Sequence, residues 1–162
     1  KQWYQRRVHG EGEGEMGTWG KVEAELEIKS PAKAFLEVFS GRPHHIANIT
    51  PGRVQGCDLH GGEWGKPNSV IFWNYVLKGK ASVSKQVVEE VDVERIRMRW
   101  REVEGHLLDD YRSIRFVMEA RGEGRVAWSV EYEKRRPELP EPLPILEFII
   151  HMTRDIDSHH LP

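Results

Sequence analysis

The chain has 162 residues, of which 38% are hydrophobic and 31% charged, and its formal net charge is −2. This length fits one domain with its own core, and the small net charge gives no field strong enough to indicate nucleic-acid binding. A single cysteine, Cys57, excludes an internal disulfide framework, and neither a membrane-spanning apolar run nor an apolar leader is present, so we expect a cytoplasmic protein.

The first fifteen residues differ in composition from the rest. Residues 10–15 alternate glycine and glutamate, which is typical of a low-complexity linker, and Met16 follows directly. We interpret residues 1–15 as a tag or an upstream extension without function, and residues 16–162 as a single domain.

The remaining chain predicts one strand, two short helices, six strands and a long helix. Apolar and charged residues alternate from 19 to 29, which predicts a half-buried strand. Ser30 as N-cap and Pro31 as first helical residue predict a helix that ends at Gly41, and residues 43–49 can form a second one. Alternation and turn residues predict the further strands 54–59, 70–77, 81–91, 95–104, 111–120 and 125–134. A proline-rich connector leads to a helix over 145–160.

Strands that follow one another in this way form a curved antiparallel meander. The C-terminal helix is the one predicted element large enough to cover a face of such a sheet. A strongly curved sheet on one helix leaves a cavity between them unless large side chains fill it.

Several short motifs, in order, carry a family resemblance. They are Arg42-Pro-His-His, Gln55-Gly-Cys-Asp-Leu-His, Gly62-Glu-Trp-Gly-Lys, Ser69-Val-Ile-Phe-Trp-Asn-Tyr, Glu104-Gly, Asp110-Tyr, Trp128, Glu131-Tyr-Glu-Lys and Asp155-Ile-Asp-Ser-His-His-Leu. From about Gly17 to Leu161 the chain resembles the plant major latex protein-like proteins of the Bet v 1-type (pathogenesis-related class ten) superfamily.

This resemblance implies an α+β helix-grip (START-like) fold. Its parts are a seven-stranded curved antiparallel sheet, two short helices in a V and a long C-terminal helix over a hydrophobic cavity. It also implies binding of small hydrophobic ligands and a role in defence or stress responses. A few members are cyclases, isomerases or condensing enzymes of specialised metabolism.

Strand alternation assigns side chains to the two faces of the sheet. The row of arginines from Arg95 to Arg101 cannot be the buried set, because four unpaired buried charges are prohibitive. Met98, Trp100 and Glu102 therefore point inward, and by the same logic Val117 points outward. The predicted ligand-contacting residues are Trp73, Tyr75, Met98, Trp100, Glu102, Ile114, Phe116, Met118, Trp128, Val130, Leu146, Ile149, Ile150 and Thr153.

Glu102 is the anomaly on the inner face and departs from the apolar residue that the family pattern has there. If the carboxyl is buried, desolvation raises its pKa and makes it a candidate catalytic acid or base, with help from Tyr75 or His45. The alternative is a glutamate near the strand end that reaches solvent or pairs with an arginine.

Two other patterns indicate no cofactor and no metal. The glycine-rich run 61–67 lacks the residues that a phosphate-binding loop requires, and we interpret it as a turn. The neighbouring histidines at 44–45 and 159–160 point in different directions and lack the companions of a zinc site.

Three functions stay open. The first is a carrier, as a monomer or weak homodimer, with a large cavity for a planar or steroid-like molecule. The second is a cofactor-independent cyclase, isomerase or condensing enzyme that uses the same cavity and Glu102. The third, which we do not expect, is binding of nucleic acid or an anionic surface through the arginine row. We expect that row to pair instead with Glu89, Glu90 and Glu119.

Overall fold

The computed structural model describes residues 3–9 and 18–159 of the chain. Within these residues the strands are β1 (Trp3–His9), β2 (Trp19–Glu27), β3 (Val54–Gly61), β4 (Val70–Leu77), β5 (Lys80–Asp92), β6 (Arg97–Gly105), β7 (Tyr111–Ala120) and β8 (Arg125–Lys134). The helices are α1 (Ala32–Gly41), α2 (Ile46–Ile49) and α3 (Leu143–Ser158), with 3₁₀ turns η1 (Pro43–His45) and η2 (His106–Asp109). No helix among the described residues has the length and apolar character needed to cross a membrane.

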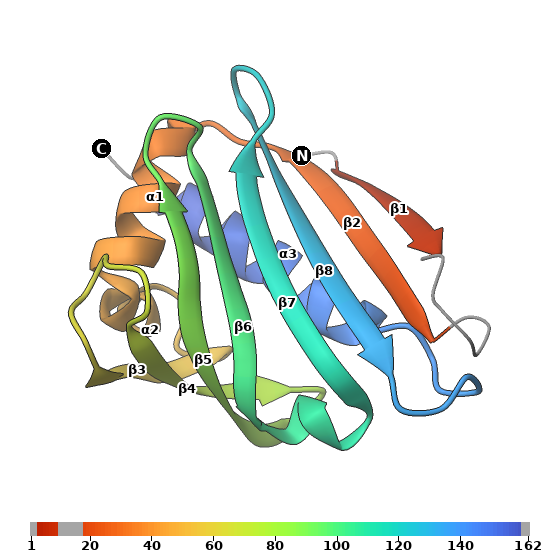
Figure 1. Cartoon of the computed structure of the whole chain (residues 1–162). Coiled ribbons are helices and arrows are strands. Elements are labelled where there is room, and N and C mark those ends of the chain that lie inside the picture. Colours follow the sequence, from red (N-terminus) through yellow and green to blue (C-terminus); the bar gives the residue numbers. More distant parts are fainter. Residues whose placement is uncertain (1–2, 10–17, 160–162) are drawn as a thin grey trace.

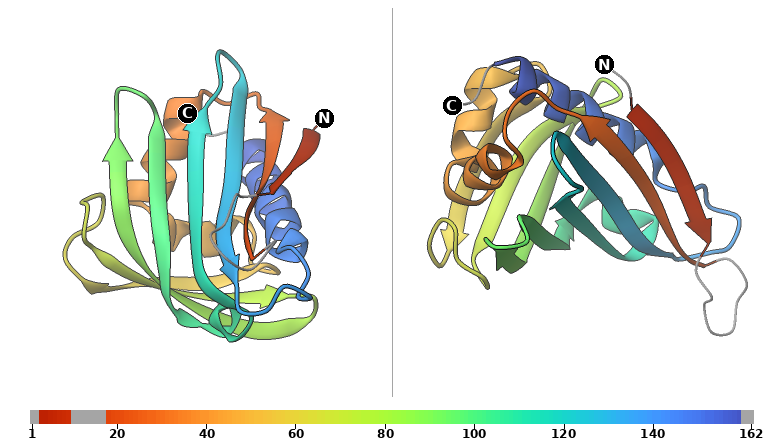
Figure 2. Two further views of the ribbon diagram at one scale, coloured as in Figure 1. Left: turned by 45° about the vertical axis from the view of Figure 1, so that its right-hand side comes forward. Right: turned by 90° about the horizontal axis from the view of Figure 1, so that it is seen from above.

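All strands belong to one curved antiparallel sheet in the order β1-β2-β8-β7-β6-β5-β4-β3 (Figure 1). Helix α3 lies across the concave face, beside α1 and α2 (Figure 2). The seven predicted strands are β2 to β8, with small differences at their ends, so the predicted helix-grip architecture is confirmed. Strand β1, which pairs with β2 at the sheet edge, was not predicted.

Two predicted element ends are wrong. Strand β6 begins at Arg97, because the preceding residues form a turn in which Ile96 has a φ of 54° and the backbone N–H of Arg95 donates to Asp92. At the start of α1 the N-cap residue is Pro31, with no side-chain capping bond. The backbone N–H of Ser30 donates to the carboxylate of Asp157 at 2.9 Å, so this segment is tied to α3 and not to its own helix.

The C-terminal half of α3 is held by two aspartates. Asp157 is buried and accepts hydrogen bonds from the backbone N–H groups of Lys29 and Ser30, between β2 and α1. Two residues earlier in the helix, Asp155 accepts from the Thr50 hydroxyl at 2.8 Å and from the Arg53 guanidinium at 3.1 Å. Charge-assisted bonds of this kind are about twice as strong as neutral ones. They fix where α3 lies over the sheet.

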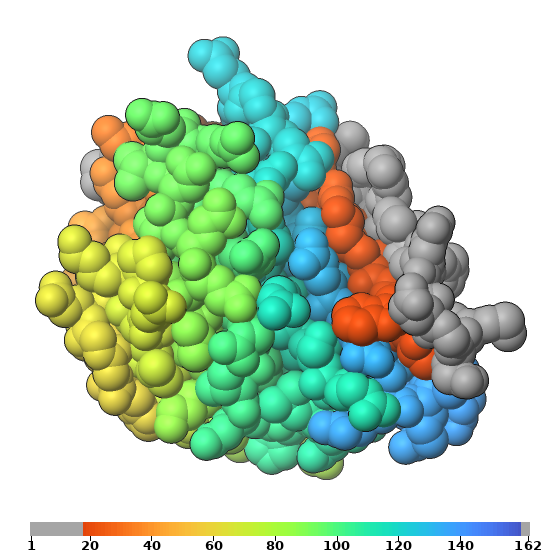
Figure 3. Space-filling model, in the orientation of Figure 1, coloured from red at the N-terminus to blue at the C-terminus, as the bar shows by residue number. Residues whose placement is uncertain are grey.

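The outer face of the sheet carries the predicted arginine row. Figure 3 shows this face in space-filling form, with the green part of the chain beside the cyan and blue parts. A bulge in β5, between Val88 and Glu90, makes Glu89 the extra residue, so both glutamates reach this face. Glu89 accepts hydrogen bonds from Arg99, Arg101 and Arg115, each at 3.0 Å. Burial alone would raise the pKa of Glu89, but the bonds from Arg115 and Arg101 outweigh it and lower the pKa.

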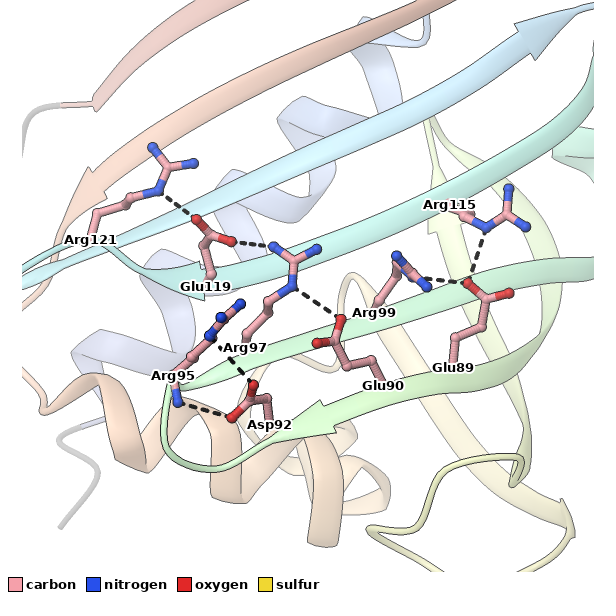
Figure 4. Close-up of polar contacts among 9 residues, drawn as sticks. All are labelled: Glu89, Glu90, Asp92, Arg95, Arg97, Arg99, Arg115, Glu119 and Arg121. Atoms are coloured by element: carbon pink, nitrogen blue, oxygen red, sulfur yellow. Dashed lines mark hydrogen bonds and ion pairs between the residues drawn. The ribbon is translucent and has the colours of Figure 1, made fainter.

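Further ion pairs extend this network across β5, β6 and β7 (Figure 4). Arg97 bridges Glu90 and Glu119, and Arg121 also pairs with Glu119. The expected pairing of the arginine row is therefore confirmed for Glu89, Glu90 and Glu119.

Val117, which was predicted to point outward, is buried on this face. It lies in register between Arg99 and Ser129, outside the main core cluster, yet it is 4% exposed. Long arginine side chains can cover apolar surface with their methylene stems. Outward orientation therefore did not mean exposure to solvent.

Replacing Glu89 with glutamine tests the importance of the outer network. The Glu89→Gln variant removes the charge shared by three arginines, and we expect its free energy of unfolding to fall by roughly 1–2 kcal/mol at low salt. The loss will shrink in 1 M NaCl. It will also shrink as the pH falls below 4.5, where the unfolded chain takes up the proton, and will vanish below the lowered pKa of the folded group, where the wild-type carboxylate is protonated too. Urea denaturation measures it.

The matched control is Glu104→Gln. Glu104 has a side chain that is 69% exposed and one weak ion pair, with Lys85 at 4.0 Å. Equal losses for the two variants would contradict a network centred on Glu89.

Candidate ligand-binding cavity

A cavity of about 70 Å³ lies between the concave face of the sheet and α3. Its lining comes from three helical segments and six strands, and most of it is apolar. The lining residues are Phe39, Val54, Trp73, Tyr75, Ser84, Gln86, Trp100, Leu107, Phe116, Trp128, Ile145, Phe148, Ile149 and Met152. The lining residues of α3 lie in its first three turns, away from the C-terminal end that Asp155 and Asp157 hold.

Aromatic side chains fill much of the space that the curved sheet encloses. Trp100 and Trp128 stack with ring centroids 5.6 Å apart, and Phe39 packs edge-on against Trp128 at 5.3 Å. On the far wall Tyr75 meets Phe148 at 5.3 Å. Sites for drug-sized ligands commonly measure about 300–1,000 Å³. The large cavity that we expected from sequence is therefore wrong in size.

The predicted ligand-contacting residues are all buried, but they divide into two groups. Those that line the cavity are Trp73, Tyr75, Trp100, Phe116, Trp128 and Ile149. Those that pack in the core without lining it are Met98, Glu102, Ile114, Met118, Val130, Leu146, Ile150 and Thr153. Thr153 is an example of the second group, and its hydroxyl donates to the Ile149 carbonyl of its own helix.

Sequence reasoning missed the other lining residues. Period-two alternation in β5 could have found Ser84 and Gln86, and the apolar stripe of α1 could have found Phe39. Leu107 lies in a 3₁₀ turn, for which the sequence carries no comparable signal.

A chain of buried hydrogen bonds leads from the cavity wall to Glu102. The Trp73 indole N–H donates to Gln86 Oε1 at 3.1 Å, the Gln86 amide donates to Ser84 Oγ at 3.0 Å, and the Ser84 hydroxyl donates to Glu102 Oε1 at 2.5 Å. Ser84 and Gln86 line the cavity, whereas Glu102 lies behind them. A molecule in the cavity would therefore meet Glu102 through Ser84.

Glu102 is 4% exposed, so the reading in which it reaches solvent is wrong. Burial raises the pKa of this carboxyl to about 8, although the hydrogen bonds from Ser84 and Gln86 oppose the shift. The missing side chain of Gly105 makes room for the carboxyl, because a β-carbon there would lie 2.5 Å from Glu102 Oε2. Burial, and then the charge of nearby Glu102, raises the pKa of the Tyr75 hydroxyl.

His45, which was predicted to assist Glu102, does not line the cavity. Its side chain is exposed and is absent from the described lining of the cavity. Its neighbour His44 stacks instead on Trp64, with ring centroids 4.5 Å apart. Among the residues that the structure describes, no cluster of three or more histidine, cysteine or carboxylate side chains could hold a metal ion.

Comparison with known proteins assigns the chain to a family. The model of the pathogenesis-related protein Bet v 1 family matches residues 17–162. The chain belongs to the Bet v 1 family. The resemblance inferred from the sequence motifs is thereby confirmed.

Relatives of this Bet v 1 family member include major latex protein-like proteins. MLP-like protein 31 of Arabidopsis thaliana is 43% identical over 147 residues, which cover 88% of this chain and 86% of that protein. The crystal structure of ginseng major latex-like protein 151 from Panax ginseng superposes with a TM-score of 0.87 at 42% identity, covering 90% of this chain and all of that one.

A more distant structure shares the fold alone. Norcoclaurine synthase from Thalictrum flavum, in complex with dopamine and hydroxybenzaldehyde, superposes with a TM-score of 0.66 at 19% identity. The match covers 86% of this chain and 87% of that one.

The buried carboxyl of this Bet v 1 family member predicts an unusual pH dependence of stability. Between the ordinary pKa of 4.5 and the raised value of about 8, the unfolded chain ionises Glu102 while the folded chain keeps its proton. Stability is therefore lost as the pH rises through this window, by several kcal/mol at about 1.4 kcal/mol per pKa unit. We expect the Glu102→Gln variant to lack this loss.

Urea denaturation at pH 5, 6.5 and 8 checks the prediction. As the pH rises, the free energy of unfolding of the wild type should fall relative to that of Glu102→Gln. Glu104→Gln, which changes an exposed carboxyl on the same strand, should run parallel to wild type. Parallel profiles for Glu102→Gln would show that the carboxyl does not hold its proton.

Proposed function

We propose that this Bet v 1 family member binds a small, mainly apolar aromatic molecule in the cavity between α3 and the sheet. The observation that carries the proposal is a buried space walled by aromatic rings, with few polar groups among its lining residues. Such sites hold ligands by burial and orient them with a small number of polar contacts.

The size of the cavity limits the ligand. About 70 Å³ is room for several waters, at roughly 10–15 Å³ each, or for a single small ring system. A steroid-like molecule would require Trp100, Trp128 and Phe39 to leave their packed positions, and interiors resist such change. We therefore narrow the expected ligand from a large planar molecule to a one-ring compound.

The wider setting of this binding is also part of the proposal. Family membership supports a role in plant defence, stress response or specialised metabolism, carried out in the cytoplasm by a monomer or weak homodimer. The third hypothesis, binding of nucleic acid or an anionic surface, loses support because Glu89, Glu90 and Glu119 offset the charge of the arginine row.

Toluene is a suitable first probe of the cavity. We expect it to bind the protein with a millimolar or tighter dissociation constant and to quench tryptophan fluorescence. The Ile149→Phe variant places a ring in the cavity and should weaken binding by about tenfold or more. Fluorescence titration, with ¹H–¹⁵N spectra to verify folding, measures the effect.

The matched control is Leu59→Phe. Leu59 is a partly buried residue of β3 outside the cavity lining, so the same kind of enlargement there should leave toluene affinity unchanged. If toluene does not bind folded wild-type protein at all, the proposed function is wrong.

A second candidate function is proton transfer on a bound molecule without a cofactor. The observation that favours it is the buried Glu102 carboxyl, with its raised pKa and its short link to Ser84 at the cavity wall. A carboxyl with a pKa near the working pH is suited to general acid–base catalysis. That a distant structural relative is a synthase is consistent with this candidate.

Deuterium exchange of acetophenone tests this second candidate. In D₂O, the ionised Glu102 takes a proton from the methyl carbon of the bound ketone by way of the Ser84 hydroxyl, and solvent returns a deuteron to that carbon. We expect the protein to raise the exchange rate at least about tenfold over buffer, and more at pH 8 than at pH 6. Proton NMR follows the methyl signal.

The Glu102→Gln variant supplies the decisive comparison. It should reduce exchange to the buffer rate, whereas Glu104→Gln should exchange as wild type does. Unchanged exchange in Glu102→Gln would remove the catalytic role and leave the carrier function in place.

A further inference from the structure

Four buried polar atoms at or behind the cavity have no hydrogen-bond partner within the described residues. They are the hydroxyl oxygen of Tyr75, the indole nitrogens of Trp100 and Trp128, and Oε2 of Glu102. The first three belong to side chains that line the cavity, and all three side chains are at least nine-tenths buried. A buried polar group left unpaired costs about 1–3 kcal/mol. Three such groups around one space therefore point to something that occupies it.

The unpaired groups are mainly hydrogen-bond donors. An indole N–H can donate but cannot accept, and a phenol O–H donates one bond. The third indole at the cavity, that of Trp73, already donates to Gln86, so the site can satisfy a tryptophan where it has an acceptor to offer. What Trp100 and Trp128 lack is an acceptor, which the occupant of the cavity would supply.

The other polar side chains of the wall do not fill this need. The oxygen of Gln86 accepts from Trp73, and the hydroxyl hydrogen of Ser84 is committed to Glu102. The lining residues include no charged side chain. An anionic ligand would therefore be buried without a counter-charge, which is strongly unfavourable.

We infer that the ligand of this cavity carries a neutral carbonyl oxygen, which accepts hydrogen bonds from the Tyr75 hydroxyl and from the indole N–H of Trp100 or Trp128. The inference rests on the proposed function and names the chemical class of its ligand. A carbonyl oxygen has two lone pairs and brings no hydrogen of its own. A hydroxyl group would bring a further donor to a site already rich in them.

The state of Glu102 is consistent with such a ligand. Because burial raises the pKa of this carboxyl to about 8, it carries its proton at neutral pH and does not repel an acceptor oxygen. Its Ser84-bonded oxygen is an acceptor, so the proton belongs on Oε2. The neutral carboxyl therefore adds a donor, and not an acceptor, behind the wall.

A pair of isosteric probes tests the inference. Acetophenone and α-methylstyrene have the same shape, but the first has a carbonyl oxygen where the second has a methylene group. We expect acetophenone to bind about tenfold more tightly at pH 7, which corresponds to one good hydrogen bond. Isothermal titration calorimetry gives both affinities.

Two further measurements identify the donors. In ¹H–¹⁵N spectra, the indole signal of Trp100 or Trp128, assigned with Trp→Phe variants, should move downfield with acetophenone and not with α-methylstyrene. The Tyr75→Phe variant should reduce the preference for acetophenone to about threefold or less while leaving α-methylstyrene affinity unchanged. Tyr111→Phe is the control, because this buried hydroxyl donates to the Pro140 carbonyl outside the cavity and its loss should not alter the preference.

The possible outcomes separate the two proposals. Equal affinities for the two probes, with unmoved indole signals, would overturn the carbonyl inference and leave the binding function standing. Failure of both probes to bind folded protein would overturn the proposed function, and the inference with it.

Discussion

The placement of α3 is the constraint on which the rest of the site depends. Asp157 and Asp155 fix its C-terminal half to the segment before α1 and to the segment between α2 and β3. These bonds hold one end of the helix against the concave sheet, and Ile156 and Thr153 are fully buried there. The first three turns of the same helix line the cavity, with Ile149 among the residues that contribute to it. Without that anchorage the helix could settle onto the sheet along its whole length and the space would close.

The strands of the sheet have an apolar inner face toward the cavity and a charged outer face. On β6, Trp100 points to the cavity while its neighbours Arg99 and Arg101 join the ion pairs of the outer face. Regular alternation would place only one of the adjacent residues Glu89 and Glu90 on that outer face, and the bulge in β5 brings both there. The bulge thus lets a row of arginines be neutralised without moving the inner residues out of register. A single sheet can in this way be apolar and crowded inside and ionic outside.

Alternation, with the turn residues, was enough to predict strands β2 to β8 and five of the fourteen residues that line the cavity, because a period of two leaves two choices for each side chain. It placed Trp100, Phe116 and Trp128 on the inner face correctly. It could not say which inward side chains border empty space and which pack against one another, since that depends on the distance between helix and sheet. Glu102 shows the limit: its burial depends on Gly105, whose missing side chain leaves room, and on a hydroxyl from another strand. The edge strand β1 lies within residues 1–15, which we had interpreted as a tag or an upstream extension.

The crowding of the cavity and its unpaired donors lead to one conclusion about recognition. A small space buries little apolar surface, so burial alone provides modest affinity and weak selection among molecules of similar size. A site with unsatisfied buried donors, by contrast, rejects analogues that lack the acceptor, because the donors then stay unpaired. Under the proposed function, Tyr75, Trp100 and Trp128 would therefore matter more for which molecule is chosen than the larger number of apolar residues around them. In the complex that we propose, the stacked indoles would both limit the size of the ligand and select its chemistry as hydrogen-bond donors.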